Sequence, residues 1–254
     1  MAATIDLRRI EEQSLNVTQP ARQVLYDGWL LRLMPGKTKR ARSVNAFYPS
    51  SLAVAHKIRH CERIYGDAGL PALFRITPFD EPRDLDTVLA SQGYARFEPT
   101  LVMVAPLDRP PANAARDGID TRTHTLAEYC AAVAAIRGST DEQRAAHEAR
   151  LAGASVSHRC AVVSHDGRPV ASGQLAYEGD VAGLFDIITA EDARGLGHAS
   201  ALCAHLLSWA WSHGMRSAYL QVTADNAPAL AVYRKFGFAE RYAYHYRCRP
   251  QEFA

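Results

Sequence analysis

The sequence contains no apolar run of the roughly 18 residues that a membrane-spanning helix needs, and its start, Met1 to Asp6, lacks the pattern of a secretory signal peptide. Its cysteines are odd in number and show no spacing typical of metal ligands. They are Cys61, Cys130, Cys160, Cys203 and Cys248. These absences predict a cytoplasmic protein with reduced thiols, no metal ion and no membrane partner.

An excess of charge of one sign is also absent. The chain has 254 residues, with 29 Lys and Arg against 27 Asp and Glu and a net charge of +2. The basic residues are dispersed, so we expect no nucleic-acid partner. One short basic run, residues 37–42, is either a strand with a solvated face or a patch for an anionic substrate. A hydrophobic content of 48% is ordinary for globular proteins and suits one large domain or two small ones.

Two common phosphate-binding motifs are missing. No Gly-x4-Gly-Lys-Ser/Thr string occurs, and Gly195-Leu196-Gly197 is followed by Ser200 where a dinucleotide-binding fingerprint has its third glycine. What is present is a glycine-rich turn between an apolar strand, 181–189, and an apolar-periodic helix. A helix N-terminus offers unpaired backbone N–H groups and the positive end of the helix dipole. The turn therefore predicts a site for a phosphorylated ligand.

The spacing Arg194-x-x-Gly197-x-Ala199 resembles the acetyl-CoA pyrophosphate loop of the GCN5-related N-acetyltransferases (GNAT), usually written Arg/Gln-x-x-Gly-x-Gly/Ala. Residues 226–238 resemble the closing motif of the same family, Asn-x-x-Ala-x-x-x-Tyr-x-x-x-Gly-Phe. The two motifs stand in the family's order, and the resemblance covers about residues 117–248. It implies the GNAT fold, an α/β (α+β) arrangement with a mixed, mostly antiparallel sheet flanked by helices.

A Pro- and Ala-rich segment divides the chain. We expect a partial GNAT-like domain over 1–107, a linker over 108–117 and a catalytic GNAT domain over 118–254. The first domain is interpreted as a degenerate copy of the fold that binds no CoA, because its helix 52–65 lacks a glycine loop and Leu89 stands where the other half has its tyrosine. Expected strands of this domain are 28–33, 40–48, 72–77 and 100–104, and expected helices are 5–15, 52–65 and 85–92. In the second domain the expected strands are 119–122, 159–165, 170–177, 181–189 and 218–223, and the expected helices include 126–137 and 141–152.

The resemblance implies which residues bind acetyl-CoA. The backbone N–H and C=O groups at the end of the strand 181–189 are expected to bind the pantetheine arm. One of these N–H groups could face the oxyanion. The turn is to bind the pyrophosphate, and His198 within it is expected at the solvent edge rather than in catalysis. The implied set is Ile187, Ile188, Thr189, Arg194, Gly195, Leu196, Gly197, His198, Ala199, Ser200, Asn226 and Tyr233.

Two catalytic residues are expected. Tyr233 suits a general acid for the leaving thiolate, because a phenol stays protonated at pH 7. Some family members carry a glutamate base five residues before the asparagine, but this position is Gln221, which cannot take a proton. Asp186, inside an otherwise apolar strand, is the best replacement, and the alternative is a hydrogen-bonded structural aspartate. Tyr177 and Glu178 are weaker candidates for the base.

These residues predict transfer of an acetyl group from acetyl-CoA to a primary amine, of a small molecule or a peptide, by direct transfer in a ternary complex. No cysteine near the motifs calls for a covalent intermediate. The alternative is a non-catalytic acyl-CoA sensor, for which Gln221 is the support. A scaffold without CoA is a third class, against which the turn and Tyr233 argue. The identity of the acceptor, the length of the acyl group and the choice between monomer and homodimer stay open.

Overall fold

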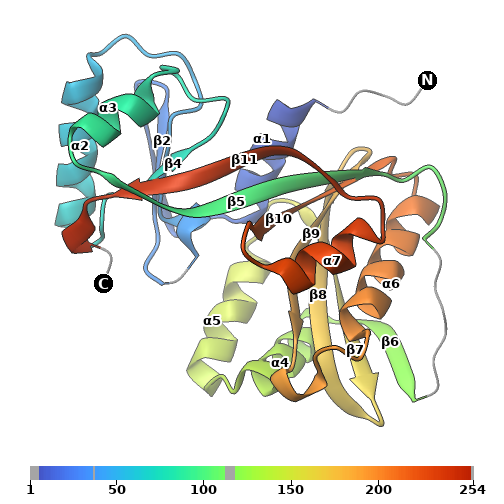
Figure 1. Ribbon diagram of the computed structural model, residues 1–254. Coiled ribbons are helices and arrows are strands. Elements are labelled where there is room, and N and C mark those ends of the chain that lie inside the picture. The colour runs from blue at the N-terminus through green and yellow to red at the C-terminus, as the bar shows by residue number, and fades with distance from the viewer. Residues whose placement is uncertain (1–5, 37, 112–117, 253–254) are drawn as a thin grey trace. The chain divides into compact units, whose positions relative to one another are not determined.

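A computed structural model describes residues 6–36, 38–111 and 118–252 of the chain, which forms two compact units (Figure 1). Unit 1 comprises Met1–Val17, Met103–Val222 and Asn226–Arg241, and unit 2 comprises Thr18–Val102, Thr223–Asp225 and Tyr242–Ala254. Neither unit is a continuous stretch, since the first helix belongs to unit 1 and the last residues to unit 2. The division at a linker over 108–117 stays a prediction, and residues 112–117 of that linker lie outside the described residues.

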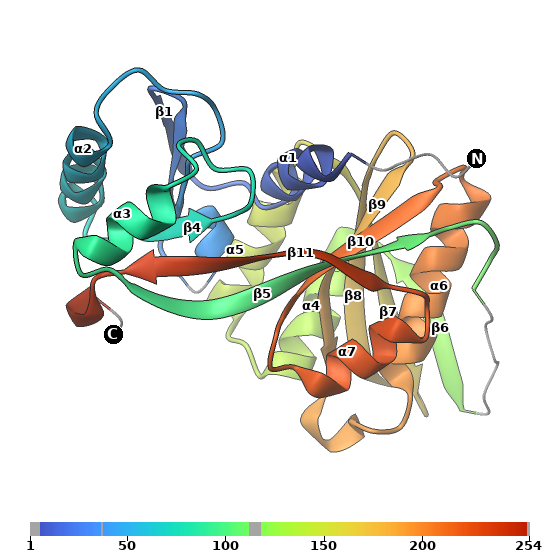
Figure 2. The same cartoon turned by 45° about the horizontal axis from the view of Figure 1, so that its top comes forward.

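Unit 1 contains a mixed sheet in the order β5-β10-β9-β8-β7-β6. The pairs β6–β7, β7–β8 and β8–β9 are antiparallel, and β9–β10 is parallel. Helices α4 and α5 contact one face and α6 the other (Figure 2). The elements are α1 (Leu7–Val17), β6 (Ile119–His124), α4 (Leu126–Arg137), α5 (Asp141–Ala152), β7 (Ser157–His165), β8 (Arg168–Glu178), β9 (Val181–Thr189), η2 (Glu191–Ala193), α6 (His198–Ser212), β10 (Ser217–Thr223, of which Thr223 belongs to unit 2) and α7 (Ala227–Arg234).

The sequence explains where α4 and α5 begin and end. Thr125 and Thr140 each accept a hydrogen bond from the backbone N–H three residues on, and the Glu or Gln at that position bonds back, which forms two capping boxes. Gly138 ends α4 with a φ of 65°, a conformation that glycine adopts without steric cost. As a result α4 matches its predicted bounds and packs Tyr129 and Val133 into the core.

Two irregularities of β9 shape the middle of unit 1. Its pairing with β10 runs only from Val181–Ser217 to Leu184–Leu220, although both strands continue. Its pairing with β8 shifts register between Ser172 and Gln174, where Asp186 takes a φ of 50°. The second feature is a β-bulge, with one more residue on β9 than on β8. The two strands of the parallel pair therefore part at the bulge.

The strands of unit 2 also form mixed pairs, in the order β1-β2-β3-β4-β11-β5. Here β3–β4 is the parallel pair, and β1–β2, β2–β3 and β4–β11 are antiparallel. Its core contains Trp29, Phe74 and Tyr94, whose rings meet edge to face around Phe74. The elements are β1 (Arg22–Tyr26), β2 (Trp29–Leu33), η1 (Lys39–Ala41), β3 (Val44–Asn45), α2 (Val54–Asp67), β4 (Phe74–Ile76), α3 (Leu85–Ser91) and η3 (Pro250–Glu252), with parts of β5 (Ala95–Pro106) and β11 (Ala239–Cys248) that it shares with unit 1.

Two expectations for unit 2 are corrected. The strand predicted over 40–48 is wrong, since only Val44–Asn45 is extended and Lys39–Ala41 is a 3₁₀ turn. An ion pair of Lys39 with Glu98 at 2.6 Å accompanies that turn. The described part of the basic run, 38–42, is thus not the solvated strand that the pattern favoured. The structure also has a strand that was not expected, β1, which pairs with β2 through the turn at Asp27.

Acid stability is expected to depend on Asp27. Its carboxylate accepts hydrogen bonds from the backbone N–H groups of Leu52 (2.9 Å) and Ser51 (3.0 Å), which hold its pKa well below the ordinary value of 3.8. Lys57, whose side chain is fully buried, lies 3.2 Å away. A carboxyl with a lowered folded pKa stabilises the fold above its unfolded pKa, and this contribution is lost as the pH falls through the folded value.

The variant Asp27→Asn should therefore lower the free energy of unfolding at pH 7 and flatten its fall below about pH 4. Urea unfolding between pH 2 and pH 7 measures both effects, with Asp67→Asn on the exposed side of α2 as the control. An unchanged pH dependence in Asp27→Asn would contradict the role of these hydrogen bonds.

Candidate active site

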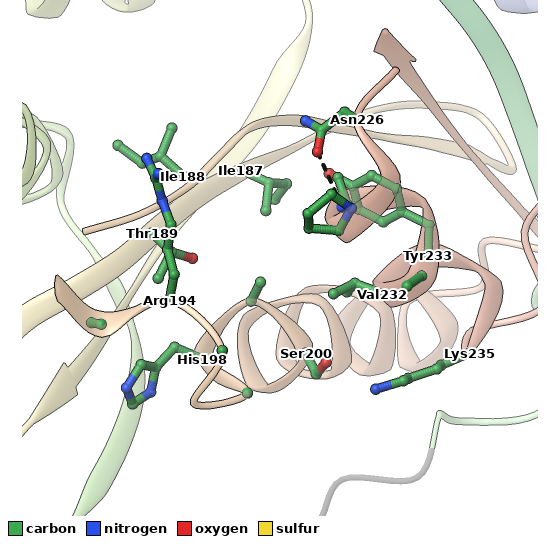
Figure 3. Close-up of a pocket in the computed structure, with 17 residues that line it drawn as sticks. Ile187, Ile188, Thr189, Arg194, His198, Ser200, Asn226, Val232, Tyr233 and Lys235 are labelled. Carbon is green, nitrogen blue, oxygen red and sulfur yellow. Dashed lines mark hydrogen bonds between the residues drawn. The ribbon is translucent and has the colours of Figure 1, made fainter. Parts of the chain in front are cut away.

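A pocket of about 810 Å³ lies in unit 1, between the end of β9, the start of α6 and the helix α7 (Figure 3). Its wall on one side is the end of β9, on another the turn before α6, and on the third the helix α7. The lining residues are Ile187, Ile188, Thr189, Ala193, Arg194, Gly195, Gly197, His198, Ala199, Ser200, Asn226, Pro228, Ala229, Ala231, Val232, Tyr233 and Lys235. None of these described residues is acidic, whereas Arg194 and Lys235 are cationic, so the pocket favours an anionic ligand.

The turn before α6 has the geometry of an anion site. Gly195 and Gly197 have φ angles of 79° and 85°, in the left-handed region that L side chains rarely adopt. Gly197 is the N-cap of α6 and supplies no capping side chain, so the first backbone N–H groups of a 15-residue helix point out of its end. The exposed Arg194 is 3.9 Å from Glu191, which is too far for a hydrogen bond. The turn thus offers backbone donors and positive charge to a phosphate group.

A glycine of β8 lets α6 lie close to the sheet. A Cβ at Gly173 would come within 2.4 Å of Cδ1 of Ile187 and 3.0 Å of Cδ2 of Leu202, the latter on α6. Ile187 therefore packs into the space that the missing side chain leaves, on the α6 face of the sheet. This packing fixes the distance between the end of β9 and the helix, the two elements that border the pocket.

Helix α7 brings Asn226 and Tyr233 to the pocket. Asn226 is the N-cap, and its Oδ1 accepts a hydrogen bond of 3.2 Å from the N–H of Ala229. Tyr233 lies near the other end of the helix, is 8% exposed, and packs its ring edge-on against Phe238 at 6.1 Å. Burial, with a smaller effect of Cys203, raises the pKa of Tyr233 well above 10. Its hydroxyl is a proton donor throughout the physiological range.

The cysteines of the fold are buried thiols, and none forms a disulfide within the described residues. Burial raises the pKa of Cys203, on α6, to about 12 and that of Cys160, on β7, also to about 12. Neither is a thiolate nucleophile at neutral pH. Within residues 6–36, 38–111 and 118–252, the structure contains no group of His, Cys, Asp and Glu that could hold a metal ion. No helix of this part of the chain is long and apolar enough to cross a membrane.

The structure gathers almost all of the residues predicted to bind acetyl-CoA around this one pocket. The exception is Leu196, which is 53% exposed and does not line it. The expectation for His198 is corrected, because this residue is 1% exposed and lies against His165 at 5.2 Å rather than at a solvent edge. In Figure 3 its ring points away from Tyr233. Sequence reasoning missed Lys235, two residues beyond Tyr233 in the closing motif.

Asp186, the second predicted catalytic residue, does not line the pocket. It is exposed at the bulge of β9, and its Oδ2 accepts a hydrogen bond of 3.0 Å from Nε2 of Gln174. It is therefore not the buried carboxylate that its apolar neighbours in the sequence indicated. The bulge accounts for the difference, because its extra residue disrupts the regular alternation of side chains along β9 and leaves Asp186 exposed.

The cap of α7 gives a stability prediction. Replacement of Asn226 by alanine removes the acceptor for the N–H of Ala229 and should lower the free energy of unfolding by about 1 kcal/mol. Aspartate at this position can accept the same bond and should retain most of the stability. Urea unfolding of Asn226→Ala and Asn226→Asp measures the difference, and equal stability of the two variants would contradict the capping role.

Comparison with known proteins agrees with this geometry. Residues 127–238 match the model of the acetyltransferase (GNAT) family. A relative from Bacillus subtilis, the uncharacterized N-acetyltransferase YobR, is 26% identical over 249 residues, which cover 96% of this chain and 99% of the relative.

Solved structures resemble the chain over almost its whole length. A GCN5-related N-acetyltransferase from Kribbella flavida has a TM-score of 0.72 at 15% identity, covering 96% of this chain and 95% of that one. A tandem GNAT protein from the clavulanic acid biosynthesis pathway has a TM-score of 0.69 at 16% identity, covering 98% and 88%. At such identities the likeness concerns the fold. Together these matches show that the chain has the GNAT fold, and they support the placement of residues 127–238 in the GNAT acetyltransferase family.

Proposed function

We propose that this protein is an N-acetyltransferase that moves an acetyl group from acetyl-CoA to a primary amine by direct transfer in a ternary complex. The observation that carries the proposal is the pocket that joins an uncapped helix N-terminus to a buried tyrosine. The match to the GNAT family supports acyl transfer in general. The nature of the acceptor and the mechanism are part of the proposal.

The residues of the pocket fit a CoA ester. The backbone of Gly195 to Ser200 and the cations Arg194 and Lys235 suit the pyrophosphate. The end of β9, Ile187 to Thr189, pairs with no strand on the β10 side within the described part of the chain, so its backbone groups on that edge can bond an extended pantetheine arm. When bound, acetyl-CoA supplies an activated acyl group as a thioester.

Tyr233 is proposed as the general acid. Its hydroxyl has no hydrogen-bond partner among the described residues, and its raised pKa keeps it protonated at neutral pH. Negative charge develops on the sulfur as the C–S bond breaks, and a hydrogen bond and proton from the phenol stabilise that charge and assist the departure of CoA. The buried Cys203 nearby is a neutral thiol, and it leaves the transfer without a covalent cysteine step.

We also propose that the chain is a tandem GNAT protein whose first half binds no CoA. The parallel pair β3–β4 of unit 2 stands in the same place in the order of elements as β9–β10 of unit 1. The segment before α2 has no glycine turn. Its N–H groups at Ser51 and Leu52 are bonded to the carboxylate of Asp27. Two of the donors that precede this helix are thus already in use.

Two measurements test the function. Calorimetry with acetyl-CoA is expected to show binding in the micromolar range. Thiol release from acetyl-CoA, followed with a panel of small primary amines and of peptides with a free N-terminus, is expected to show turnover with at least one amine. Binding without turnover on the whole panel would favour an acyl-CoA sensor, and no binding would contradict both functions.

A further inference from the structure

A group of polar side chains lies on the face of β9 opposite the pocket. Its centre is Oδ2 of Asp186, which is 3.0 Å from Nε2 of Gln174 on β8. On α5, Nη2 of Arg150 is 3.6 Å and Nε2 of His147 is 3.9 Å from the same oxygen. The pocket uses none of these side chains. Two strands and one helix thus converge on one carboxylate oxygen.

The bulge puts Asp186 on this face. Phe185 is paired with Gln174, and directly opposed residues of neighbouring strands share a face. Regular alternation would turn the next residue, Asp186, to the α6 side. The extra residue of the bulge instead leaves Asp186 beside α5 and turns Ile187 toward α6 and the pocket. Asp186 and Ile187 therefore lie on opposite faces of the sheet, Asp186 on the α5 side and Ile187 on the α6 side.

The two faces meet where β9 leaves β10. The last pair of the parallel strands is Leu184–Leu220, and Asp186 lies two residues beyond it. Past this point no backbone pairing between the described parts of β9 and β10 closes the sheet. A thioester held along the pocket side of Ile187 and a molecule held by Asp186 would approach the same opening from opposite faces.

His147 has the surroundings of a base. Its side chain is 11% exposed, and its Nε2 is buried without a hydrogen-bond partner among the described residues. Burial, Arg150 of α5 and Arg137 of α4 lower its pKa below the ordinary 6.5, and Asp186 of β9 partly offsets them. From α4, Tyr129 also faces the imidazole, with ring centroids 6.1 Å apart. At neutral pH the imidazole is therefore uncharged and able to accept a proton.

The separation of the two groups suits a donor between them. The 3.9 Å from Nε2 of His147 to Oδ2 of Asp186 exceeds a hydrogen bond, so a nitrogen held by Oδ2 can bridge the two atoms once the imidazole, whose Nε2 is buried, turns to meet it. The carboxylate is 37% exposed, so an ammonium group can reach it from solvent. An acceptor with a protonated primary amine matches this negative, accessible group.

We propose that Asp186 binds the nitrogen of the acceptor amine and that His147 is the base that takes its proton. This inference rests on the proposed function. A C–N bond forms between the amine and the acetyl carbon as the C–S bond of the thioester breaks. The ammonium nitrogen loses two protons to Nε2 of His147 in turn: the first passes on to solvent and leaves the neutral amine that attacks, and the second leaves as the amide forms. The CoA sulfur takes the hydroxyl proton of Tyr233. Exchange with solvent then returns the imidazolium and the phenolate to their starting states.

The first test needs no acceptor. NMR titration of the histidines is expected to place the pKa of His147 below 6.5 and to show a further decrease in Asp186→Asn, because the carboxylate is the group that raises it. Arg150→Gln should have the opposite effect. His205 on α6, whose pKa burial also lowers, should not respond to Asp186→Asn and is the internal control. A His147 pKa that is unchanged in Asp186→Asn would overturn the pairing.

The second test uses the amine of the panel that gives the fastest thiol release. With both substrates saturating, kcat of the wild type should rise with pH through the pKa of His147 and then level off. His147→Gln, which keeps a polar atom near Nε2, should lower kcat at pH 7 about 100-fold and lose this acidic limb. His205→Gln should keep both. An acidic limb that persists in His147→Gln would show that the polar contacts of Asp186 with α5 have only a structural role, and would overturn the proposal.

Failure of the inference and failure of the function give different results. His147→Gln should bind acetyl-CoA with the wild-type Kd, because the pocket lies on the other face of β9. If the wild type neither binds acetyl-CoA nor releases thiol, the proposed function falls, and the role of His147 as a base falls with it. If the wild type turns over and His147→Gln does so at the same rate, only the assignment of the base falls. Circular dichroism of each variant confirms that it is folded.

Discussion

Phenylalanine in place of Tyr233 is expected to lower kcat for thiol release at pH 7 by at least about 100-fold and to leave the Kd of acetyl-CoA unchanged. The ring keeps its place against Phe238 at 6.1 Å, so the variant removes the hydroxyl and little else. Stopped-flow or steady-state thiol release measures kcat, and calorimetry measures the Kd. Tyr177→Phe is the matched control, since Tyr177 lies on β8, packs against Trp209 and does not line the pocket.

The pH dependence of this defect separates proton donation from simple packing. A free thiol has a pKa of about 8.5, so above this pH CoA leaves as a stable thiolate and needs the phenol less. The deficit of Tyr233→Phe should therefore shrink between pH 7 and pH 9.5. Burial holds the pKa of Tyr233 above this range, so the wild type should show no alkaline loss of kcat from this residue. A deficit that is the same at both pH values would contradict the role of Tyr233 as acid.

The sequence predicts the elements of unit 1 well because each carries its own local signal. The strand over 181–189 and the helices over 126–137 and 141–152 are confirmed; the strand has an apolar run, and a capping box marks the start of each helix. The GNAT fold is confirmed as well. Local signals suffice for the two helices, since each begins and ends on interactions within a few residues.

Unit 2 is less predictable because its short strands depend on distant partners. Every residue of β1 is exposed or half-buried, so it lacks the alternation that indicates a strand. Its signal was the dipeptide Asp27-Gly28, with φ angles of 42° and 80°, which is typical of a two-residue hairpin. The false strand over 40–48 has alternating residues, but Lys39 and Arg40 are held by Glu98 and Tyr244, far away in the sequence.

At the site, motifs predict contacts with the ligand, and they do not predict burial or bulges. The turn and the closing motif give the residues of the pocket because backbone groups at fixed spacing carry the chemistry. His198 was misplaced because nothing in the sequence tells which side of the first turn of α6 the sheet covers. The partners of Asp186 on α5 could not be predicted, since they depend on one extra residue in β9.

The glycine turn gives the largest expected effect on binding. In Gly197→Trp the Kd of acetyl-CoA should rise at least 100-fold, to the limit of detection by calorimetry. Two causes act together: a side chain at a φ of 85° strains the backbone, and an indole fills the space in front of the first N–H groups of α6. These groups are the phosphate donors of the proposed site, so the ligand loses them all at once.

The matched control stands just beyond the other end of the same helix. Gly214 has a φ of 86° and open space around it, so Gly214→Trp imposes the same backbone strain away from the pocket. If both variants lose binding equally, strain in α6 rather than the turn is responsible, and the phosphate site is misassigned. If Gly197→Trp alone loses binding while its thermal unfolding matches that of Gly214→Trp, the loss belongs to the donors of the turn. Tyr233→Phe should leave this Kd unchanged. Gly197→Trp and Tyr233→Phe together therefore separate the groups that bind acetyl-CoA from the group that protonates its sulfur.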